Sequence, residues 1–211
     1  MQTIDLTHPI EPGMPVYPGT EPPEFVRACT LAANGFAETR LSLYTHTGTH
    51  MDAPAHILAD GLPLDAMPVS RFIGPACVLD LTACAGQTVE VDTVLAQRAR
   101  LAGCEFVLLR TGWSRFWGQP GYFGGYPVLA VAAAAWLADQ GLKGVGIDAI
   151  SLDAVESPDL PVHRVLLGRG LVLIENLANL EALPTTGFQL ACFPLKLRDA
   201  DGSPVRAVAL V

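Results

Sequence analysis

The residues most able to do chemistry lie in one short segment, residues 45–56, which reads Thr-His-Thr-Gly-Thr-His-Met-Asp-Ala-Pro-Ala-His. The segment contains three of the five histidines of the chain, and Asp52 lies among them. Neutral imidazoles and carboxylates are common protein ligands of zinc, manganese and ferrous iron. The segment therefore predicts metal or catalytic chemistry, against the alternative of a polar loop whose histidines only make hydrogen bonds.

The backbone of this segment is expected to bend. Gly48 and Pro54 disfavour an unbroken helix, because glycine weakens a helix and proline both lacks a donor and clashes with the preceding turn. In a straight strand, at about 3.3 Å per residue, His46 and His50 would lie about 13 Å apart and could not share one ion. We therefore expect a strand that runs into a tight loop, with Gly48 at the bend.

Length and composition favour one globular domain over residues 1–211, with a sizeable core. Half of the residues are apolar and 16% are charged, which excludes a disordered chain and is compatible with a buried oligomer interface. The net charge of −8 and the absence of a run of Lys and Arg argue against binding to nucleic acid or to an anionic membrane.

The sequence also predicts a cytoplasmic location. No basic-then-apolar signal segment opens the chain, and its longest apolar run, residues 128–138, is too short to span a bilayer. The five cysteines show no Cys-x-x-Cys spacing, which is typical of reduced, mostly buried thiols.

Hydrophobic patterns and turn signals predict more strands than helices. Strands are expected at residues 3–8, 25–31, 38–44, 76–81, 105–110, 144–148, 171–175, 187–197 and 204–210. Helices are expected at residues 91–101, with Asp92 as the N-cap, and at residues 128–140, with Pro127 at the first position. The turn Ala33-Asn34-Gly35, with its Asn-Gly hairpin signal, would join the second and third strands. The result is an α/β domain with a mixed, partly barrel-like sheet and flanking helices.

Three loop regions carry further candidate residues. Residues 9–23 are rich in proline and glycine, which excludes a helix and favours an ordered rim loop. The aromatic-rich residues 111–126 are compatible with a dimer interface, a pocket wall or simple packing. Asp148, Ser151 and Asp153 follow a strand end, where site residues and turn or cap residues are equally common, so we do not assign them to the site.

His163 and Glu175 are the candidate ligands outside the main segment. His163 lies in an expected short helical turn, and Glu175 closes the apolar run Leu171-Val172-Leu173-Ile174. A glutamate in that position must be paired, exposed or bound to a metal. The residues alone leave these three possibilities open.

The pattern His-x-Gly-Thr-His-x-Asp-x-Pro-x-His, at residues 46–56, resembles the signature of the cyclase family of metal-dependent hydrolases, which includes bacterial kynurenine formamidases. Every fixed position of that signature is present. His163-Arg164-Val165-Leu166-Leu167 and residues 174–180 resemble the second signature of the same family. The likeness covers nearly the whole chain and implies a swivelling β/β/α fold.

The resemblance implies a dinuclear metal site. His46, His50 and Asp52 would hold one ion, and Asp52 would bridge to a second ion held by His163 and Glu175. We expect two zinc ions per chain, although manganese and iron accept the same donors. Mixed nitrogen and oxygen ligands, with no cysteine nearby, are typical of an open catalytic site.

The resemblance also implies roles for His56 and Tyr17. The family assigns the His56 position to proton donation and acceptance, and the alternative is a further ligand or a supporting residue. Tyr17 would present an aromatic face to the substrate, or else pack on neighbouring prolines. Kynurenine formamidases characteristically place Trp before the Pro-Gly of this loop and Asp after it, whereas this chain has Tyr17 and Thr20. We therefore expect a smaller or differently shaped substrate.

The expected activity is hydrolysis of an amide bond in a small, aromatic substrate, like that of arylformamidases. The alternatives are an isatin-type cyclic amide hydrolase, a metal-dependent cyclase or dehydratase acting on a polyketide-like substrate, and a non-enzymatic metal-binding protein. The family resemblance also implies a homo-oligomer, either a dimer or a tetramer.

Overall fold

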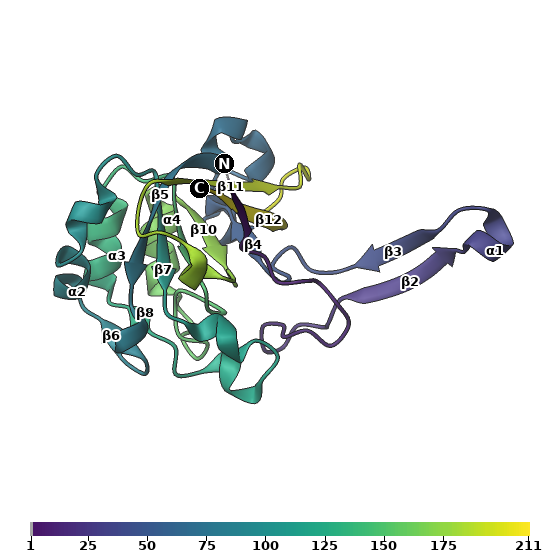
Figure 1. The fold of residues 1–211 in the computed structure, drawn as a ribbon, viewed down its shortest axis with the longest axis horizontal. Helices are drawn as coiled ribbons and strands as arrows, with labels where there is room; N and C mark the ends of the chain where they lie inside the picture. The colour runs from purple at the N-terminus through teal and green to yellow at the C-terminus, as the bar shows by residue number, and fades with distance from the viewer. Residues whose placement is uncertain (1) are drawn as a thin grey trace.

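The computed structural model describes residues 2–211 and is organised around one mixed sheet (Figure 1). In spatial order its eight strands are β1 (Thr3–Asp5), β12 (Gly202–Leu210), β11 (Phe188–Pro194), β5 (Ile73–Asp80), β7 (Phe106–Arg110), β9 (Gly144–Ile147), β10 (Val172–Glu175) and β4 (His50–Asp52). Because β4 pairs with β12 as well as with β10, every strand except β1 belongs to a closed ring. The expected α/β fold with a partly barrel-like sheet is confirmed.

The apolar runs of the sequence form the parallel part of this sheet. Strands β5, β7, β9 and β10 are parallel neighbours, and the remaining pairs are antiparallel. Side chains alternate between the two faces of a strand, so Val107 and Leu109 enter one core while Phe106 and Leu108 enter another. A strand buried on both faces contains a continuous apolar run, which explains the sequence Phe106-Val107-Leu108-Leu109.

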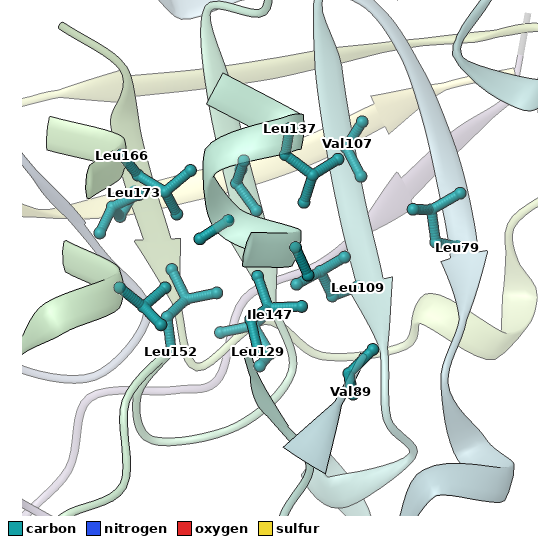
Figure 2. Packing of buried hydrophobic residues seen from close by; sticks show 14 of the residues in the cluster. Leu79, Val89, Val107, Leu109, Leu129, Leu137, Ile147, Leu152, Leu166 and Leu173 are labelled. Carbon is teal, nitrogen blue, oxygen red and sulfur yellow. The ribbon is translucent and has the colours of Figure 1, made fainter. Parts of the chain in front are cut away.

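Three helices cover one face of the sheet: α2 (Val91–Leu95), α3 (Val131–Ala138) and α4 (Pro161–Gly168). Figure 2 shows Leu137 and Leu166 among the sheet residues Val107, Leu109 and Leu173 in this first core. The second core lies on the opposite face, which the closed ring encloses.

Both predicted helices are shorter than expected. The first ends at Leu95 and continues as a separate 3₁₀ turn, Arg98–Leu101, and its N-cap position is Glu90, so the prediction of Asp92 as the cap is wrong. The second begins only at Val131, because Val128–Leu129 forms strand β8 against β6 (Thr88–Val89). The pairing requires an extended backbone there, so the prediction of Pro127 at the first helical position is also wrong.

Further single turns of 3₁₀ helix link these elements. They are Pro54–His56, Leu64–Ala66, Val69–Phe72, Thr82–Cys84, Trp113–Phe116, Pro120–Phe123 and Leu180–Ala182. Two of them lie in the aromatic-rich segment, where Trp113, Tyr122 and Tyr126 are buried in the first core. Packing is therefore confirmed as one role of that segment.

The predicted hairpin forms a separate arm. Strands β2 (Glu24–Cys29) and β3 (Glu38–Ser42) pair antiparallel and extend away from the sheet (Figure 1). Their connection is the one-turn helix α1 (Leu31–Asn34), which Gly35 ends with φ of 77°, rather than only the tight turn expected at Ala33-Asn34-Gly35. Residues 20–44, including the roots of the arm, are called the arm segment below.

The remaining composition-based expectations concern thiols and membrane helices. All five cysteines are free; Cys77 and Cys192 are buried, and the other three are partly exposed. Among residues 2–211, no helix has both the length and the apolar character needed to cross a bilayer.

Candidate metal centre

The backbone of the histidine-rich segment bends at Gly48, as the sequence predicts, with φ of 68°. The order of the elements differs from the expectation, because the turn precedes strand β4 rather than following it. His50 and Asp52 are alternate residues of β4, so both point to one face, while Met51 points into the second core. Pairing of β4 with β10 sets His50 opposite Glu175 and so brings the two signatures together.

Two of the candidate ligands, His46 and His50, are each held by both ring nitrogens. The Nδ1 atom of His46 lies 2.7 Å from Oδ1 of Asp52, and its Nε2 atom lies 3.1 Å from Oδ2 of Asp201. The Nε2 atom of His50 lies 3.2 Å from Oδ1 of Asp52, and its Nδ1 atom lies 2.8 Å from the carbonyl oxygen of Gly48. In each ring one nitrogen therefore faces the central carboxylate, and the other contacts an outer acceptor that fixes the ring orientation.

His163 repeats this arrangement from the other side of the site. It projects from α4, and its Nε2 atom lies 3.3 Å from Oε1 of Glu175 and 3.7 Å from Oδ2 of Asp52. Its Nδ1 atom lies 2.7 Å from Oδ2 of Asp153. The Asp153 carboxylate also accepts the backbone N–H groups of Val162 and His163, so it anchors the start of α4 and the ring together.

The carboxylate of Asp52 lies at the centre of these groups. Its side chain is 1% exposed, and its Oδ2 atom has no hydrogen-bond partner among residues 2–211. A buried carboxylate oxygen without a partner is costly, whereas a divalent cation is a natural partner for it. The residues therefore fit a metal.

The structure brings together both ligand sets expected from the sequence. Donor atoms within 4.8 Å of one another come from His46, His50 and Asp52, and from Asp52, His163 and Glu175. A third set, not expected, combines His46 with His56 and Asp201. Occupation of these sets by metal stays a prediction.

The buried charges shift the acidities of the candidate ligands. Burial alone would raise the pKa of Asp52, but the imidazoles of His50 and His46 outweigh it and hold that pKa well below its usual range. Burial alone would lower the pKa of His46 and of His163. The charge of Asp52 instead raises the pKa of His46 to about 9, and hydrogen bonds to Asp153 and Glu175 raise that of His163 to about 10.

A cavity of about 280 Å³ opens above the centre. Besides the expected ligands, its walls are formed by Tyr17, Thr20, His56, Ile150, Ser151 and Leu160. Tyr17 donates its hydroxyl to the carbonyl oxygen of Val155, 3.0 Å away, which gives the phenol the partner it needs in a cavity wall. Both predicted non-ligand residues, Tyr17 and His56, thus reach the cavity.

His56 lies on the short turn that follows β4, at the edge of the ligand sets. Its ring centroid is 4.1 Å from that of His46, and its Nδ1 atom lies 3.8 Å from Oδ2 of Asp201, beyond hydrogen-bond range. Burial lowers the pKa of His56 below its ordinary value, despite the opposing charge of Asp52. The neutral imidazole is therefore favoured at pH 7 and can accept a proton.

Asp201 and Asn176 contribute to the site but were not predicted from the sequence. Asp201 precedes β12, and its neighbour Gly202 pairs with Asp52; a Cβ atom on Gly202 would lie 2.5 Å from Cε1 of His46. Asn176 follows Glu175, adopts φ of 56° and donates to the carbonyl oxygen of Gly48, which holds the bend. Asp201 is 155 residues from His46, so no local signal could connect them.

Comparison with known proteins identifies the family. The model of the Cyclase family matches residues 4–154, which is more than half of the chain. The chain belongs to the Cyclase family. The match includes the first signature, whereas His163 and Glu175 lie beyond it.

Relatives of this Cyclase family chain include two enzymes named kynurenine formamidase. The enzyme from Bacillus cytotoxicus is 30% identical over 97% of this chain and 95% of its own length. The one from Bacillus mycoides is 31% identical over 98% of this chain and 96% of its own length.

Among solved structures, the chain resembles an isatin hydrolase bound to the product analogue thioisatinate. That match has a TM-score of 0.91 and 27% identity, and it covers 100% of this chain and 92% of the other. Isatin hydrolase A from Ralstonia solanacearum matches with a TM-score of 0.88 and 29% identity over 100% and 92% of the two chains. The chain is a hydrolase acting on C–N bonds other than peptide bonds.

The carboxylate of Asp201 orients His46, so its loss should weaken metal binding without unfolding the protein. We expect Asp201→Asn to raise the dissociation constant for zinc by about 10–100-fold, the usual effect of losing a group that supports a ligand. Competition with a fluorescent chelator measures this. Asp199→Asn is the matched control, because Asp199 lies on the same loop with φ of 55°, which asparagine tolerates. Equal affinities in the two variants would contradict the role of Asp201.

The raised pKa values of His46 and His163 predict that metal binding is coupled to proton release. Both rings are protonated at pH 7 in the metal-free protein, but only neutral imidazole binds a metal, so binding should release about two protons per chain and strengthen as the pH rises. Conversely, the two charged rings stabilise the metal-free fold fully below about pH 6.5, the ordinary histidine pKa. That contribution is lost as the pH rises through about 9 and about 10. Calorimetric zinc titrations in buffers of different ionisation enthalpy count the protons, and a count near zero would refute the coupling.

Proposed function

We propose that this chain hydrolyses an amide bond in a small, aromatic molecule by metal-dependent chemistry. The observation that carries the proposal is the buried Asp52 carboxylate, shared by two ligand sets beneath a cavity that Tyr17 and His56 line. Two enzyme classes among its relatives, kynurenine formamidases and isatin hydrolases, support a hydrolase that acts on C–N bonds outside peptides.

In this proposal His46, His50 and Asp52 hold one divalent metal, and Asp52, His163 and Glu175 hold a second. Zinc suits these donors, and manganese or iron would accept them too. When bound, the metal supplies a Lewis acid that polarises the substrate carbonyl and a water acidic enough to act near neutral pH. The ring contacts with Asp201, Gly48 and Asp153 keep the donor nitrogens aimed inward before any ion arrives.

We assign proton transfer to His56. Hydrolysis adds water across the amide, so the carbonyl carbon gains the hydroxyl and the leaving nitrogen must gain a proton. The neutral ring of His56 accepts a proton from the attacking water and returns it to the nitrogen as the C–N bond breaks. Because the Nδ1 atom of His56 faces Asp201, we assign the transfer to Nε2. The third ligand set keeps a metal-binding role for His56 as the alternative.

The residues that line the cavity indicate which substrate would fit it. Tyr17 offers a smaller aromatic face than the tryptophan characteristic of kynurenine formamidases, and Thr20 replaces an acidic residue with a neutral one. We therefore propose a smaller or differently shaped substrate than N-formylkynurenine. A cyclic amide is the second candidate, because the isatin hydrolase structures match the chain over its full length.

We further propose that the enzyme is a cytoplasmic homo-oligomer of single-domain chains. The free cysteines, with no disulfide among residues 2–211, support a reducing compartment. The exposed apolar side chains of the arm support association.

The roles proposed for His56 and Asp52 predict different effects of two substitutions on metal content and on kcat. His56→Asn should keep two metal ions per chain and lower kcat by about 10²–10⁴-fold, the range for a lost general acid or base. Asp52→Asn should instead lose metal, because it removes the charge that both ligand sets share. Elemental analysis of saturated samples beside steady-state kinetics distinguishes them. If His56→Asn empties a site, His56 is a ligand, and one ion per wild-type chain would rule out the dinuclear arrangement.

The substrate proposal is tested by kcat/KM for N-formylkynurenine beside smaller formyl-aromatic amines and cyclic amides including isatin. We expect a member of the panel to exceed N-formylkynurenine. Tyr17→Trp should raise affinity for N-formylkynurenine by up to about tenfold, because aromatic stacking contributes about 0.5–1.5 kcal/mol. A native kcat/KM for N-formylkynurenine above about 10⁴ M⁻¹s⁻¹, well ahead of the panel, would show that the substrate proposal is wrong. If the metal-bound protein hydrolyses none of these amides, the proposal that it is an amide hydrolase is wrong.

A further inference from the structure

Two loops that are distant in sequence form walls of the cavity above the candidate metal centre. One is the rim loop, residues 9–23, which contributes Tyr17 to the cavity. The other is the 148–160 loop between β9 and α4, which contributes Ile150, Ser151 and Leu160. The hydroxyl of Tyr17 donates to the carbonyl oxygen of Val155, 3.0 Å away in the 148–160 loop. One hydrogen bond therefore bridges the two walls.

The rim loop has few other contacts that fix its position. Within residues 2–211, the bond from Tyr17 is the only hydrogen bond that joins residues 9–20 to another part of the chain. Among these residues only Met14 is buried, and it lies beside the bend at Gly48. The hydroxyl and the N–H group of Thr20 both donate to the carbonyl oxygen of Tyr17, which holds the turn but does not attach it elsewhere. The place of Tyr17 over the cavity therefore depends on its own hydroxyl.

The 148–160 loop is held much more firmly. Tyr126 donates its hydroxyl to the carbonyl oxygen of Asp153, 2.6 Å away. The carboxylate of Asp153 in turn accepts backbone N–H groups of α4 and lies 2.7 Å from Nδ1 of His163. This wall is anchored to the candidate ligands, so the rim loop is the wall that yields when the cavity has to widen.

The Tyr17 hydroxyl stays a donor at neutral pH. Burial raises the pKa of Tyr17 above its ordinary value, and the charges of Glu175, Glu156 and Asp153 raise it further, so the phenol keeps its proton. Tyr17 and Val155 are both partly buried and pack against the first core, which limits competition from water for their hydrogen bond.

We propose that this bridging hydrogen bond sets the width of the cavity and thereby selects substrates by size. The inference rests on the proposed function, because it concerns substrate entry into the same cavity. A compact aromatic amide binds with the bond intact. A bulkier amide binds only after the rim loop has moved away and the bond has broken, so its kcat/KM is lowered by the free energy of that opening. Tyr17 thus determines specificity through its hydroxyl, separately from any contact of its ring with the substrate.

Tyr17→Phe tests the proposal, because it removes the hydroxyl and keeps the aromatic ring. The measurement is kcat/KM for formanilide and isatin beside their tert-butyl ring derivatives. We expect the ratio of the bulky to the compact value to rise about two- to tenfold, through a gain for the bulky substrate, which is the change that the net free energy of one hydrogen bond allows. A loss of stability alone would lower both values and would leave their ratio unchanged.

The matched control is Tyr44→Phe. The hydroxyl of Tyr44 contacts the carboxylate of Glu21 within the arm segment and lies outside the residues that line the cavity. The control makes the same chemical change at another tyrosine, so it should keep the wild-type ratio. An unchanged ratio in Tyr17→Phe, or an equal rise in the control, would overturn the proposal.

Amide hydrogen exchange tests the bridging bond without a substrate. The N–H group of Thr20 reports on the turn that carries Tyr17. Its exchange, followed by NMR, should be about two- to tenfold faster in Tyr17→Phe than in wild type, because the loop opens more readily. Equal exchange rates would show that the bond does not restrain the loop. If no amide is hydrolysed, the proposed function fails, and the exchange rates alone then support or overturn the bridging bond.

Discussion

A buried carboxylate with an unpartnered oxygen is the constraint on which this structure depends. Asp52 is held between three imidazoles, and the cost of burying its charge is offset only because His46, His50 and His163 surround it. The low pKa of Asp52 and the raised pKa of His46 express the same attraction from its two sides, whereas hydrogen bonds to Asp153 and Glu175 raise the pKa of His163. A divalent cation would satisfy this cluster better than protons do, since it also gives the remaining oxygen of Asp52 a partner.

The sheet makes that cluster possible by closing on itself. Strand β4 has only three residues, yet it bonds to both β10 and β12. One pairing delivers Glu175, and the other delivers Gly202 and the preceding Asp201. The first core supports α4 and with it His163. Each ligand thus comes from an element that the packing holds, as a preorganised site requires.

Each histidine ring of the two ligand sets is held in one orientation by a hydrogen bond from the nitrogen that faces away from the centre of the site. Asp201, Gly48 and Asp153 each take one ring nitrogen and leave the other to face inward. Asn176 in turn holds the Gly48 carbonyl and is itself bonded to the buried hydroxyl of Tyr122. The aromatic-rich segment therefore reaches the ligands through a chain of hydrogen bonds, although the charged centre lies elsewhere in the sequence.

The sequence by itself determined the local part of this centre: the donor types, the bend at Gly48 and the strand that ends on Glu175, because these follow from residue chemistry and short-range backbone limits. It also determined the mixed α/β sheet, since apolar periodicity records burial. Only the tertiary structure decided that β4 closes the ring, that Asp201 and Asp153 support the rings, and that Val128 joins a strand instead of a helix. Those outcomes depend on contacts between residues far apart in the chain. The hydrophobic pattern of one segment does not indicate which distant segment it contacts.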